Sequence, residues 1–471
     1  MAENYGWLSV LPPLLAILLA IRTKQVFLSL FFGVWFGWII IARWNPLAGL
    51  AQALDATVDV FKDPGNTRVI IFSAMVGAVL AFTQRSGGVE GFIQWSNQRG
   101  LSTSRRRAAL LSWAVGLVLF VESSITILVR GAIARPVFDR LHISREKLAY
   151  ILDSTSAPIC ILIPLNAWGA FVIGLLSTQG VAHPVHVFAR AIPFNFYAIF
   201  AALLVVVVVL LDRDFGPMRE AERRAREEGR VLREGAEPLI ATEVVELSVK
   251  EGVQLRARNM LIPIAVMVLM MPVGLLITGH GNLMEGSGST AVFWSVLAAI
   301  AAASGLYLAQ GIFTLNEIVD LFFKGIGGLM PMAVLMVLAF AIGATCRALG
   351  TGPYVAGLAR GFLNPNLVPA AIFVVSAFIA FSTGTSFGTF AIMIPIAVPM
   401  AVGLGASMSP TVAAVLGGGV FGDHCSPISD TTIIASMASA SDHIDHVRTQ
   451  LPYALAAAGL AFLFYLGVGF L

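Results

Sequence analysis

The residues best suited to chemistry lie in one segment, Gly417–Thr432, which reads GGGVFGDHCSPISDTT. The segment places two carboxylates, Asp423 and Asp430, and the imidazole of His424 between two apolar runs, and Pro427 interrupts it. Charged groups and broken backbone cost free energy at membrane depth unless they line a cavity or a pathway. This segment is therefore the first candidate for a site that binds or moves ions.

Other interrupted apolar runs carry the same kinds of side chain. The candidates for ion or proton binding are Asp423, Asp430, Glu122, Asp153 and His424. The candidates for coordinating a cation or a substrate are Ser123, Ser124, Thr126, Ser154, Thr155, Ser156, Thr383, Thr385, Ser386, Ser426, Ser429 and Thr431. Hard cations take such oxygen ligands, together with backbone carbonyls that an unwound helix sets free. We expect Na⁺ at Asp430, Asp423 and Ser429.

Exchange of a cation for a proton requires an acid that holds one or the other, but not both. Burial favours the protonated form of a carboxyl group, and a bound cation favours its ionised form. Asp423 and Asp430 are about two helical turns apart, and Pro427 argues against an unbroken helix between them. We expect one acid to bind the ion while the other titrates or anchors the backbone, with His424 tuning the proton chemistry.

Each of these groups also has a structural interpretation. Asp153 and Asp430 precede hydroxyl residues at the start of a half-helix, where a carboxylate caps free N–H groups. Glu122 can pair with Arg130, and His424 can serve as a hydrogen-bonded structural residue. The hydroxyl residues can act as packing contacts between helices.

Composition places the whole chain in a membrane. Of its 471 residues, 57% are hydrophobic and 12% are charged, the mean hydropathy is +0.84, and the formal net charge is +3. Apolar runs long enough to span a bilayer recur from end to end. The first of them, Trp7–Ile21, is followed almost at once by Val26–Ala42, which indicates a hairpin of spans rather than a cleaved signal peptide. The fold class we predict is an all-α polytopic membrane protein with about ten spans.

The residues that several other classes of protein require are missing from the sequence. The three cysteines, Cys160, Cys346 and Cys425, have no disulfide or metal spacing. A Walker-type phosphate loop is absent, which argues against a primary pump, and a convincing nucleophile or metal set for an enzyme is lacking. The two histidines of Asp442–Arg448 sit at the end of a span, and we interpret this stretch as a solvated interfacial turn.

The chain repeats one plan in two inverted halves. Residues 1–211 form the first repeat, with a re-entrant hairpin at about 108–138 and a broken helix at about 148–176. Residues 259–471 form the second repeat, with a hairpin at about 367–404 and a broken helix at about 410–441. Ser156–Ile159 (SAPI) aligns with Cys425–Ile428 (CSPI). Discontinuous helices at matching places in inverted halves point to the binding site of a secondary transporter.

The hydrophilic segment 212–258 separates the two halves. Glu220 and Arg224, and likewise Glu222 and Arg226, have i,i+4 spacing, which predicts that part of the segment is a surface helix. We expect the segment to be a cytoplasmic connector.

Two motifs resemble the NhaC family of Na⁺/H⁺ antiporters, within the ion transporter superfamily. They are GVFGDHCSPISDTT at Gly419–Thr432 and SREKLAYILDSTSAP at Ser144–Pro158, the latter followed by NAWGA at Asn166–Ala170. The resemblance implies Na⁺/H⁺ exchange or, in relatives, exchange of organic acids coupled to the same gradients. Many members of the family carry a DDY stretch where this chain has Glu122-Ser123-Ser124, and this departure favours a subgroup that carries an organic solute.

These observations predict a secondary active transporter of the inner (cytoplasmic) membrane and not an enzyme. The leading function is exchange of Na⁺ or Li⁺ for protons by alternating access. The alternative is a Na⁺- or H⁺-coupled transporter of a small organic carboxylate or amine. The expected partners are the lipid bilayer, Na⁺, H⁺ and, in the alternative, that solute. No cofactor and no nucleic acid are expected, and a homodimer is left open.

Overall fold

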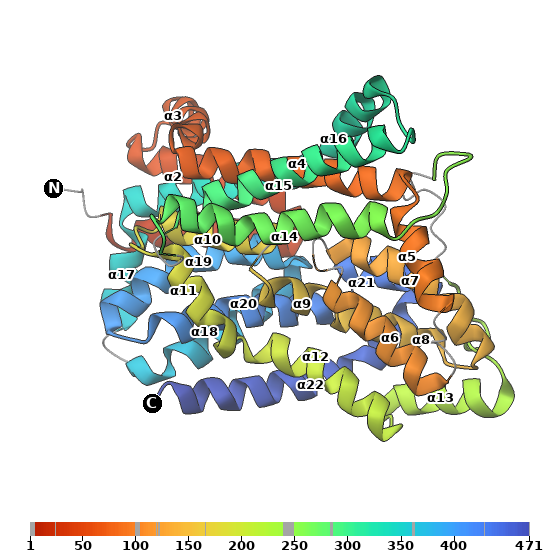
Figure 1. Ribbon diagram of the computed structural model, residues 1–471. Coiled ribbons are helices and arrows are strands. Elements are labelled where there is room, and N and C mark those ends of the chain that lie inside the picture. The colour runs from red at the N-terminus through yellow and green to blue at the C-terminus, as the bar shows by residue number, and fades with distance from the viewer. Residues whose placement is uncertain are drawn as a thin grey trace.

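The protein is helical throughout the part that the structure describes (Figure 1). The structure is a computed structural model that describes residues 5–470 except 24, 99–103, 119, 121–122, 165, 239–248, 283–285, 360–362 and 428. Among these residues, β pairing is confined to one isolated bridge between Pro238 and Asp442. The all-α fold class is thereby confirmed.

In chain order, the helices belong to the first half, the connector and the second half. Those of the first half are α1 (Leu11–Thr23), α2 (Val26–Ile41), α3 (Pro46–Asp59), α4 (Pro64–Arg85), α5 (Gly88–Gln98), α6 (Arg105–Val118), α7 (Ser123–Arg140), α8 (Arg145–Ser154), α9 (Ala157–Leu162), α10 (Ala167–Thr178), α11 (Pro184–Ala191) and α12 (Phe196–Leu211). The connector contains α13 (Gly216–Glu228). The second half contains α14 (Arg258–Thr278), α15 (Gly288–Ala309), α16 (Leu315–Leu349), α17 (Thr351–Ala359), α18 (Val368–Thr383), α19 (Ser386–Leu404), α20 (Met408–Cys425), α21 (Asp430–Ser439) and α22 (His443–Val468). Short 3-10 turns lie at Gly6–Val10, Val60–Lys62, Ile192–Phe194 and Pro365–Leu367.

Many of the described helices are long and apolar enough to cross a bilayer. Seven meet this standard by length and composition, and an eighth is obtained if Pro184–Phe194 and Phe196–Leu211, bent by 44°, are counted as one span. The seven are α4, α14, α15, α16, α18 with its preceding turn, α19 and α22. The protein is therefore a multi-pass membrane protein.

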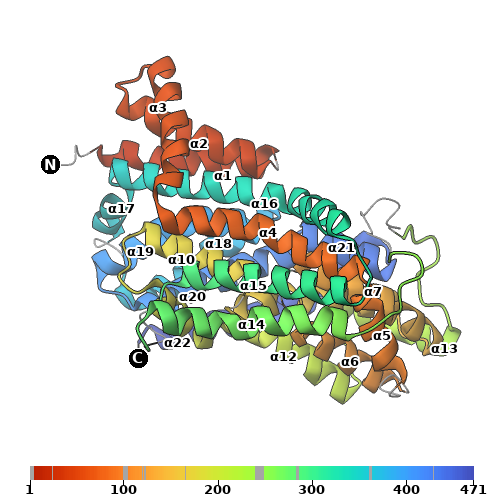
Figure 2. The same ribbon diagram turned by 45° about the horizontal axis from the view of Figure 1, so that its top comes forward.

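The helix pairs α6–α7 and α18–α19 lie towards opposite ends of the molecule, and the interrupted segments α8–α10 and α20–α21 run in opposite directions. In Figure 1 the N- and C-termini lie at the left and α13 at the lower right. The helices α6 and α7 turn back towards the right-hand end, whereas α18 and α19 lie in the left-hand half (Figure 1). The chain in α8, α9 and α10 runs from right to left, and in α20 and α21 it runs from left to right. Helix α3 projects from the top, as Figure 2 shows more clearly.

A close crossing of α4 and α16 joins the two halves. A Cβ atom added at Gly77 would lie 2.0 Å from the carbonyl oxygen of Gly325, and one added at Gly325 would lie 2.4 Å from that of Gly77. Two backbones approach this closely only where side chains are absent, which is the usual role of small residues between membrane helices.

We predict that Gly77→Ala destabilises the protein by about 1–3 kcal/mol, because the new methyl group overlaps the backbone of α16. The matched control is Gly327→Ala, whose Cβ would meet no atom within 4 Å and which gains helix propensity. Thermal unfolding of the detergent-purified protein measures both. Equal melting temperatures for the two variants would contradict the close crossing.

Candidate functional site

The first interruption lies between α8 and α9. Helix α9 starts at Ala157, and Pro158 has no N–H group, so α8 cannot continue through this point. Ser156 occupies the N-cap position of α9 but its side chain makes no capping bond, and its hydroxyl donates instead to the Asp153 carbonyl at 3.0 Å. Asp153 lies in the last turn of α8. The interpretation of Asp153 as the cap of the following half-helix is therefore wrong.

The Asp153 carboxylate is fully buried and gathers partners from three other helices. Its Oδ2 accepts hydrogen bonds from Gln450 Nε2 at 2.7 Å and from Thr432 Oγ1 at 3.2 Å. The same oxygen lies 3.5 Å from His446 Nε2 and 3.8 Å from His424 Nε2. Asp153 Oδ1 is buried and has no hydrogen-bond partner among the described residues. The structure thus brings α8 of the first half into contact with α20, α21 and α22 of the second half.

His424 is held by the first half on both ring nitrogens. Its Nδ1 lies 2.6 Å from the hydroxyl of Tyr197 on α12, and its Nε2 lies 3.1 Å from Ser154 Oγ. Its carbonyl oxygen accepts from Gln450 Nε2 at 2.7 Å. The predicted residues Asp153, Ser154 and His424 therefore meet in one buried polar centre.

Asp423 faces a different partner, the tip between α18 and α19. Gly384 turns the chain there with a φ of +67°, and Thr385 caps α19 by accepting from Gly388 N at 3.3 Å. Asp423 Oδ2 accepts from Ser386 Oγ at 2.6 Å and from Ser386 N at 3.1 Å. This carboxylate therefore sits at the positive end of α19. Asp423 Oδ1 is buried and has no hydrogen-bond partner in the described part of the chain.

The second interruption lies between α20 and α21. Helix α20 ends at Cys425, and α21 begins at Asp430. Ser429 takes the N-cap position and accepts from Thr432 N at 3.4 Å, so the interpretation of Asp430 as the cap is wrong. Ser429 Oγ also lies 3.1 Å from Thr431 Oγ1. The Asp430 side chain, and with it the expected Na⁺ position at Asp430, lies outside the described residues.

Several predicted coordinating hydroxyls bond to nearby carbonyls. Thr383 Oγ1 donates to Ile379 O at 2.9 Å, within its own helix. Ser426 Oγ donates across helices to Phe381 O at 2.7 Å. These two bonds satisfy the hydroxyl hydrogens and leave their oxygens able to accept.

A buried arginine supports the end of α8. The Arg130 guanidinium on α7 donates to Thr155 Oγ1 at 2.6 Å and to the carbonyl oxygens of Leu152, Thr126 and Ser112 at 2.7, 3.1 and 3.2 Å. Only 1% of its surface is exposed. The carbonyls near the broken end of α8 that lack a helical partner thereby gain a charged donor.

The tip between α6 and α7 is only partly described. Glu122 and the side chain of Ser124 lie outside the described residues, whereas Ser123 and Thr126 are buried. Asn166, the cap of α10, donates from Nδ2 to the carbonyl oxygen of Phe120 at 2.9 Å, which ties this tip to the broken helix.

Sequence reasoning missed His446 and Gln450. The interpretation of Asp442–Arg448 as a solvated turn is wrong for His446, which is 0% exposed and faces Asp153. Both ring nitrogens of His446 are buried without a hydrogen-bond partner among the described residues. The available signal was the i,i+4 spacing of His446 and Gln450, which places both side chains on one face of α22.

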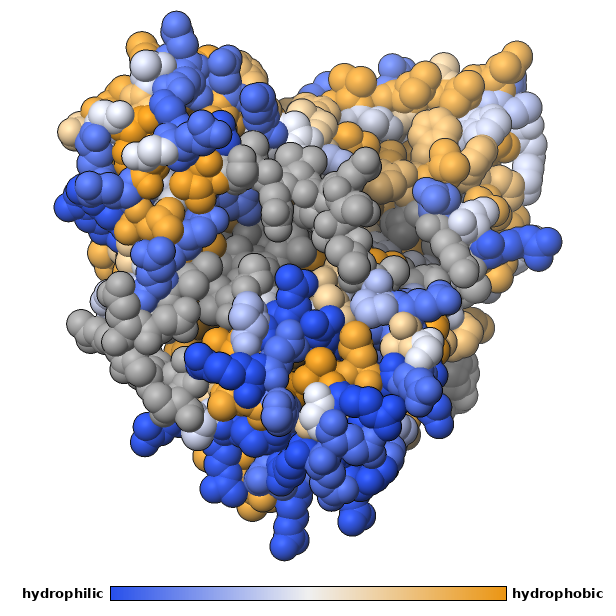
Figure 3. Space-filling view, turned by 90° about the vertical axis from the view of Figure 1, so that its right-hand side faces the viewer, coloured by the Kyte–Doolittle hydropathy of each residue, from blue (hydrophilic) through white to orange (hydrophobic). Residues whose placement is uncertain are grey.

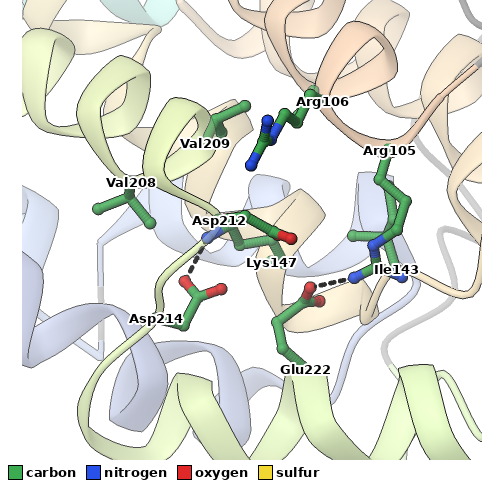
Figure 4. A pocket seen from close by; sticks show the side chains of 10 residues that line it. Arg105, Arg106, Ile143, Lys147, Val208, Val209, Asp212, Asp214 and Glu222 are labelled. Carbon is green, nitrogen blue, oxygen red and sulfur yellow. Dashed lines mark hydrogen bonds and ion pairs between the residues drawn. The ribbon is translucent and has the colours of Figure 1, made fainter.

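The connector helix α13 forms as predicted, but its charges reach other helices. Arg224 pairs with the buried Glu146 of α8 at 2.8 Å instead of with Glu220. Figure 4 shows two further contacts, Arg105 with Glu222 and Lys147 with Asp214. Hydrophilic side chains gather over the lower part of this end of the molecule (Figure 3). The connector is thus fixed to the N-terminal ends of α6 and α8.

The same segment also contacts α22. Arg233 Nε lies 2.9 Å from Asp445 Oδ2, and Glu237 N donates to Asp442 Oδ2 at 3.0 Å. Burial would raise the pKa of Asp442, but N–H donors from Glu237, Asp445 and Ile444 outweigh it and hold the pKa below its usual value. Segment 212–258 therefore bridges α8 and α22 as well as linking the two halves.

A resident metal ion has no obvious protein site in the described part of the chain. No group of three or more His, Cys, Asp or Glu residues gathers there in a way that could hold one. The buried oxygens of the centre are those that suit a transported cation.

Interrupted helices from two halves, meeting at buried acids and imidazoles inside a multi-pass helical protein, define a secondary transporter. The chain belongs to the Na⁺/H⁺ antiporter family, which it matches over residues 170–470. The resemblance to NhaC is confirmed, and the protein is a transporter and not an enzyme.

Relatives in this family differ in what their names say they carry. The chain is 34% identical to an uncharacterized protein of Haemophilus influenzae, over 98% of this chain and 91% of that protein. It is 29% identical to the malate-2H⁺/Na⁺-lactate antiporter of Bacillus subtilis over 31% of each chain. It is also 28% identical to the Na⁺/H⁺ antiporter NhaC of Alkalihalophilus pseudofirmus over 36% of each chain.

Two solved transporter structures share the fold. The YdaH transporter of Alcanivorax borkumensis is 16% identical, with a TM-score of 0.56 over 89% of this chain and 88% of that chain. MtrF of Neisseria gonorrhoeae is 14% identical, with a TM-score of 0.55 over 89% of this chain and 84% of that chain. At these identities the likeness concerns the fold alone.

We predict that Arg130→Lys destabilises the protein by about 3 kcal/mol or more, because one ammonium group cannot reach all the acceptors that the guanidinium fork serves. Arg140→Lys, at an exposed position near the end of the same helix, is the control. Thermal unfolding in detergent compares the two. An unchanged melting temperature for Arg130→Lys would refute its supporting role.

We also predict an interaction energy of about 1–3 kcal/mol between Arg224 and Glu146, because Glu146 is buried against the connector. A double-mutant cycle with Arg224→Gln and Glu146→Gln in mixed-micelle unfolding measures it. The exposed pair Arg223 and Glu227, 3.2 Å apart on α13, is the control and is expected to give no resolvable coupling. Equal coupling in the two pairs would mean that the connector is not fixed by this contact.

Proposed function

We propose that this secondary transporter exchanges Na⁺ or Li⁺ for protons by alternating access. The observation that carries the proposal is the half-satisfied carboxylate of Asp423. One of its oxygens is fixed by two bonds from Ser386, and the other is buried without a partner among the described residues. A buried carboxylate oxygen in this state requires either a proton or a cation.

In this proposal Asp423, Ser429 and Asp430 bind the cation, as expected from their sequence. Ser386 orients the carboxylate, so that Asp423 Oδ1 is the ligand. The interruption between α20 and α21 supplies hydroxyl and carbonyl oxygens from residues around Ser429. Binding of the cation then competes directly with protonation of the same acid, which is the requirement for exchange.

The cluster of Asp153, His424 and His446 is proposed to handle protons. Its support is the close approach of two imidazoles to one carboxylate in a fully buried setting, at 3.5 and 3.8 Å. Imidazoles and carboxylates inside membrane helices are the side chains from which proton pathways are built. The cluster reaches both interrupted helices, so a change in its protonation acts on both.

The end of the molecule that carries α13 is proposed to face the cytoplasm, across the inner membrane. Arg105, Lys147 and Arg224 gather at this end, which agrees with the excess of basic residues on the cytoplasmic side of membrane proteins. The opposed directions of the two hairpins in Figure 1 support the proposal of two inverted repeats, 1–211 and 259–471, joined by the connector.

A second candidate function is coupled transport of a small organic solute. It is favoured by the name of the Bacillus subtilis relative, a malate/lactate antiporter, and by the hydroxyl residues at the first hairpin tip. The two candidates differ in what must be added to drive proton movement: a cation alone, or a cation with a carboxylate or an amine.

The test uses proteoliposomes that hold a pH-sensitive dye and an imposed proton gradient. We predict that Na⁺ or Li⁺ dissipates the gradient in the unmodified protein. Asp423→Asn is expected to lower the rate at least about 100-fold, because an amide cannot exchange a proton for a cation. Asp320→Asn, at an exposed position of α16, should leave the rate unchanged.

Melting temperatures of each variant separate loss of function from loss of fold. A well-folded Asp423→Asn protein with normal exchange would refute the role of Asp423. If the unmodified protein responds to no cation alone but responds when lactate, malate or an amine is added with Na⁺, the second candidate function is correct.

A further inference from the structure

A second cavity lies away from the polar centre. It has a volume of about 480 Å³, is partly open to solvent and is lined mainly by residues of α2, α3, α4, α10 and α16. These parts of the helices lie at the end of the molecule opposite α13 (Figures 1 and 2). None of the described residues that line it belongs to the polar centre. Pockets of about 300–1,000 Å³ suit small organic molecules, whereas a bare ion needs far less space.

Three aspartates line the cavity. Asp55 and Asp59 come from α3, and Asp63 precedes α4. Asp59 pairs with Lys62 at 2.6 Å, and Asp63 uses Oδ1 to cap α4 at 2.7 Å from Asn66 N. Asp55 makes no ion pair or hydrogen bond within the described chain. These three carboxylates are not gathered closely enough to hold one metal ion.

One arginine also lines the cavity. Arg347, on α16, lines the cavity and has no carboxylate within ion-pair distance among the described residues. A guanidinium group left free in this way favours a planar carboxylate, which it binds with two parallel hydrogen bonds.

The wall also contains buried polar atoms that lack a partner. Two buried atoms that belong to lining residues, the amide oxygen Oε1 of Gln52 and the indole Nε1 of Trp38, have no hydrogen-bond partner among the described residues. The rings of Trp38 and Phe340 add apolar surface that also attracts cations. A buried amide oxygen without a protein partner, a free carboxylate and a free guanidinium are together the features of a ligand site.

We propose that this cavity binds a small zwitterionic solute with an ammonium group and a carboxylate. The ammonium group faces Asp55, with Asp63 adding negative charge, and the carboxylate binds Arg347. Because acidic residues outnumber basic ones in the wall, a solute with a second ammonium group is favoured over a neutral amino acid. The site is separate from the cation site at Asp423 and does not depend on exchange there.

The test is isothermal titration calorimetry on the full-length protein in detergent at low salt. The probe is L-lysine, and butylamine and succinate test the ammonium and carboxylate ends separately. Saturable binding of lysine is expected, with butylamine and succinate each at least about tenfold weaker. Asp55→Asn and Arg347→Gln are each expected to weaken lysine binding by at least about tenfold.

Two controls separate this site from the centre and from misfolding. Asp320→Asn, a surface aspartate on α16, and Asp423→Asn should bind lysine as the unmodified protein does. Loss of lysine binding in Asp423→Asn would place the solute at the centre and overturn the proposal. Absence of saturable binding, tighter binding of succinate, or normal binding by Asp55→Asn with an unchanged melting temperature would also overturn it. If the protein shows no Na⁺-driven proton flux, lysine is still expected to bind, so the proposed function and this proposal can fail independently.

Discussion

The Asp153 carboxylate is the charge on which the polar centre depends. It is buried at the broken end of α8, where water is excluded and an ionised group is stable only with partners. Those partners are an amide, a hydroxyl and two imidazoles from the second half of the chain. The two halves are therefore joined at the centre by polar contacts that only this relative arrangement satisfies. Apolar packing elsewhere is less specific, because one aliphatic contact substitutes readily for another.

The sequence predicted the interruptions well because their causes are local. Pro158 and Pro427 remove backbone donors, and Gly384 turns the chain with a positive φ, so each break is visible from a few neighbouring residues. Hydroxyl and carboxylate residues around these breaks were identified for the same reason. Hydropathy alone also indicated the long apolar helices α14, α15 and α22, whereas the first two predicted spans are shorter helices than a full crossing needs.

The partners of these residues could not be predicted in the same way. Gln450 and Asp153 are 297 positions apart, and no local pattern indicates that they meet. His446 lies close to the end of a span, where hydropathy favours an exposed position, yet the fold buries it. Helix α5 lies in a basic stretch that carries no span signal. The capping role considered for Asp430 went to Ser429, whereas Ser156 at the N-cap of α9 makes no capping bond. Which residue caps a helix depends on where the helix starts, to within one residue.

Transporters with different substrates can share one fold. This chain shares its architecture with two solved transporters at 14–16% identity, and part of it is similar to exchangers whose names give different substrates. A common scaffold of this kind is compatible with many cargoes, because selectivity resides in the few side chains that touch the cargo. Residues such as Ser386 and Asp423 are therefore more informative about the substrate than the fold is.

The bridge made by segment 212–258 has a mechanical consequence. Helices α8 and α22 touch in the middle of the molecule, through Asp153 and Gln450, and are tied a second time near their ends, through the connector. Two rods fastened at two points along their length cannot tilt independently. Helices α8 and α22 therefore behave as one rigid body. A rocking motion that alternates access must either move both helices together or first break the ion pairs of Arg224 with Glu146 and of Arg233 with Asp445.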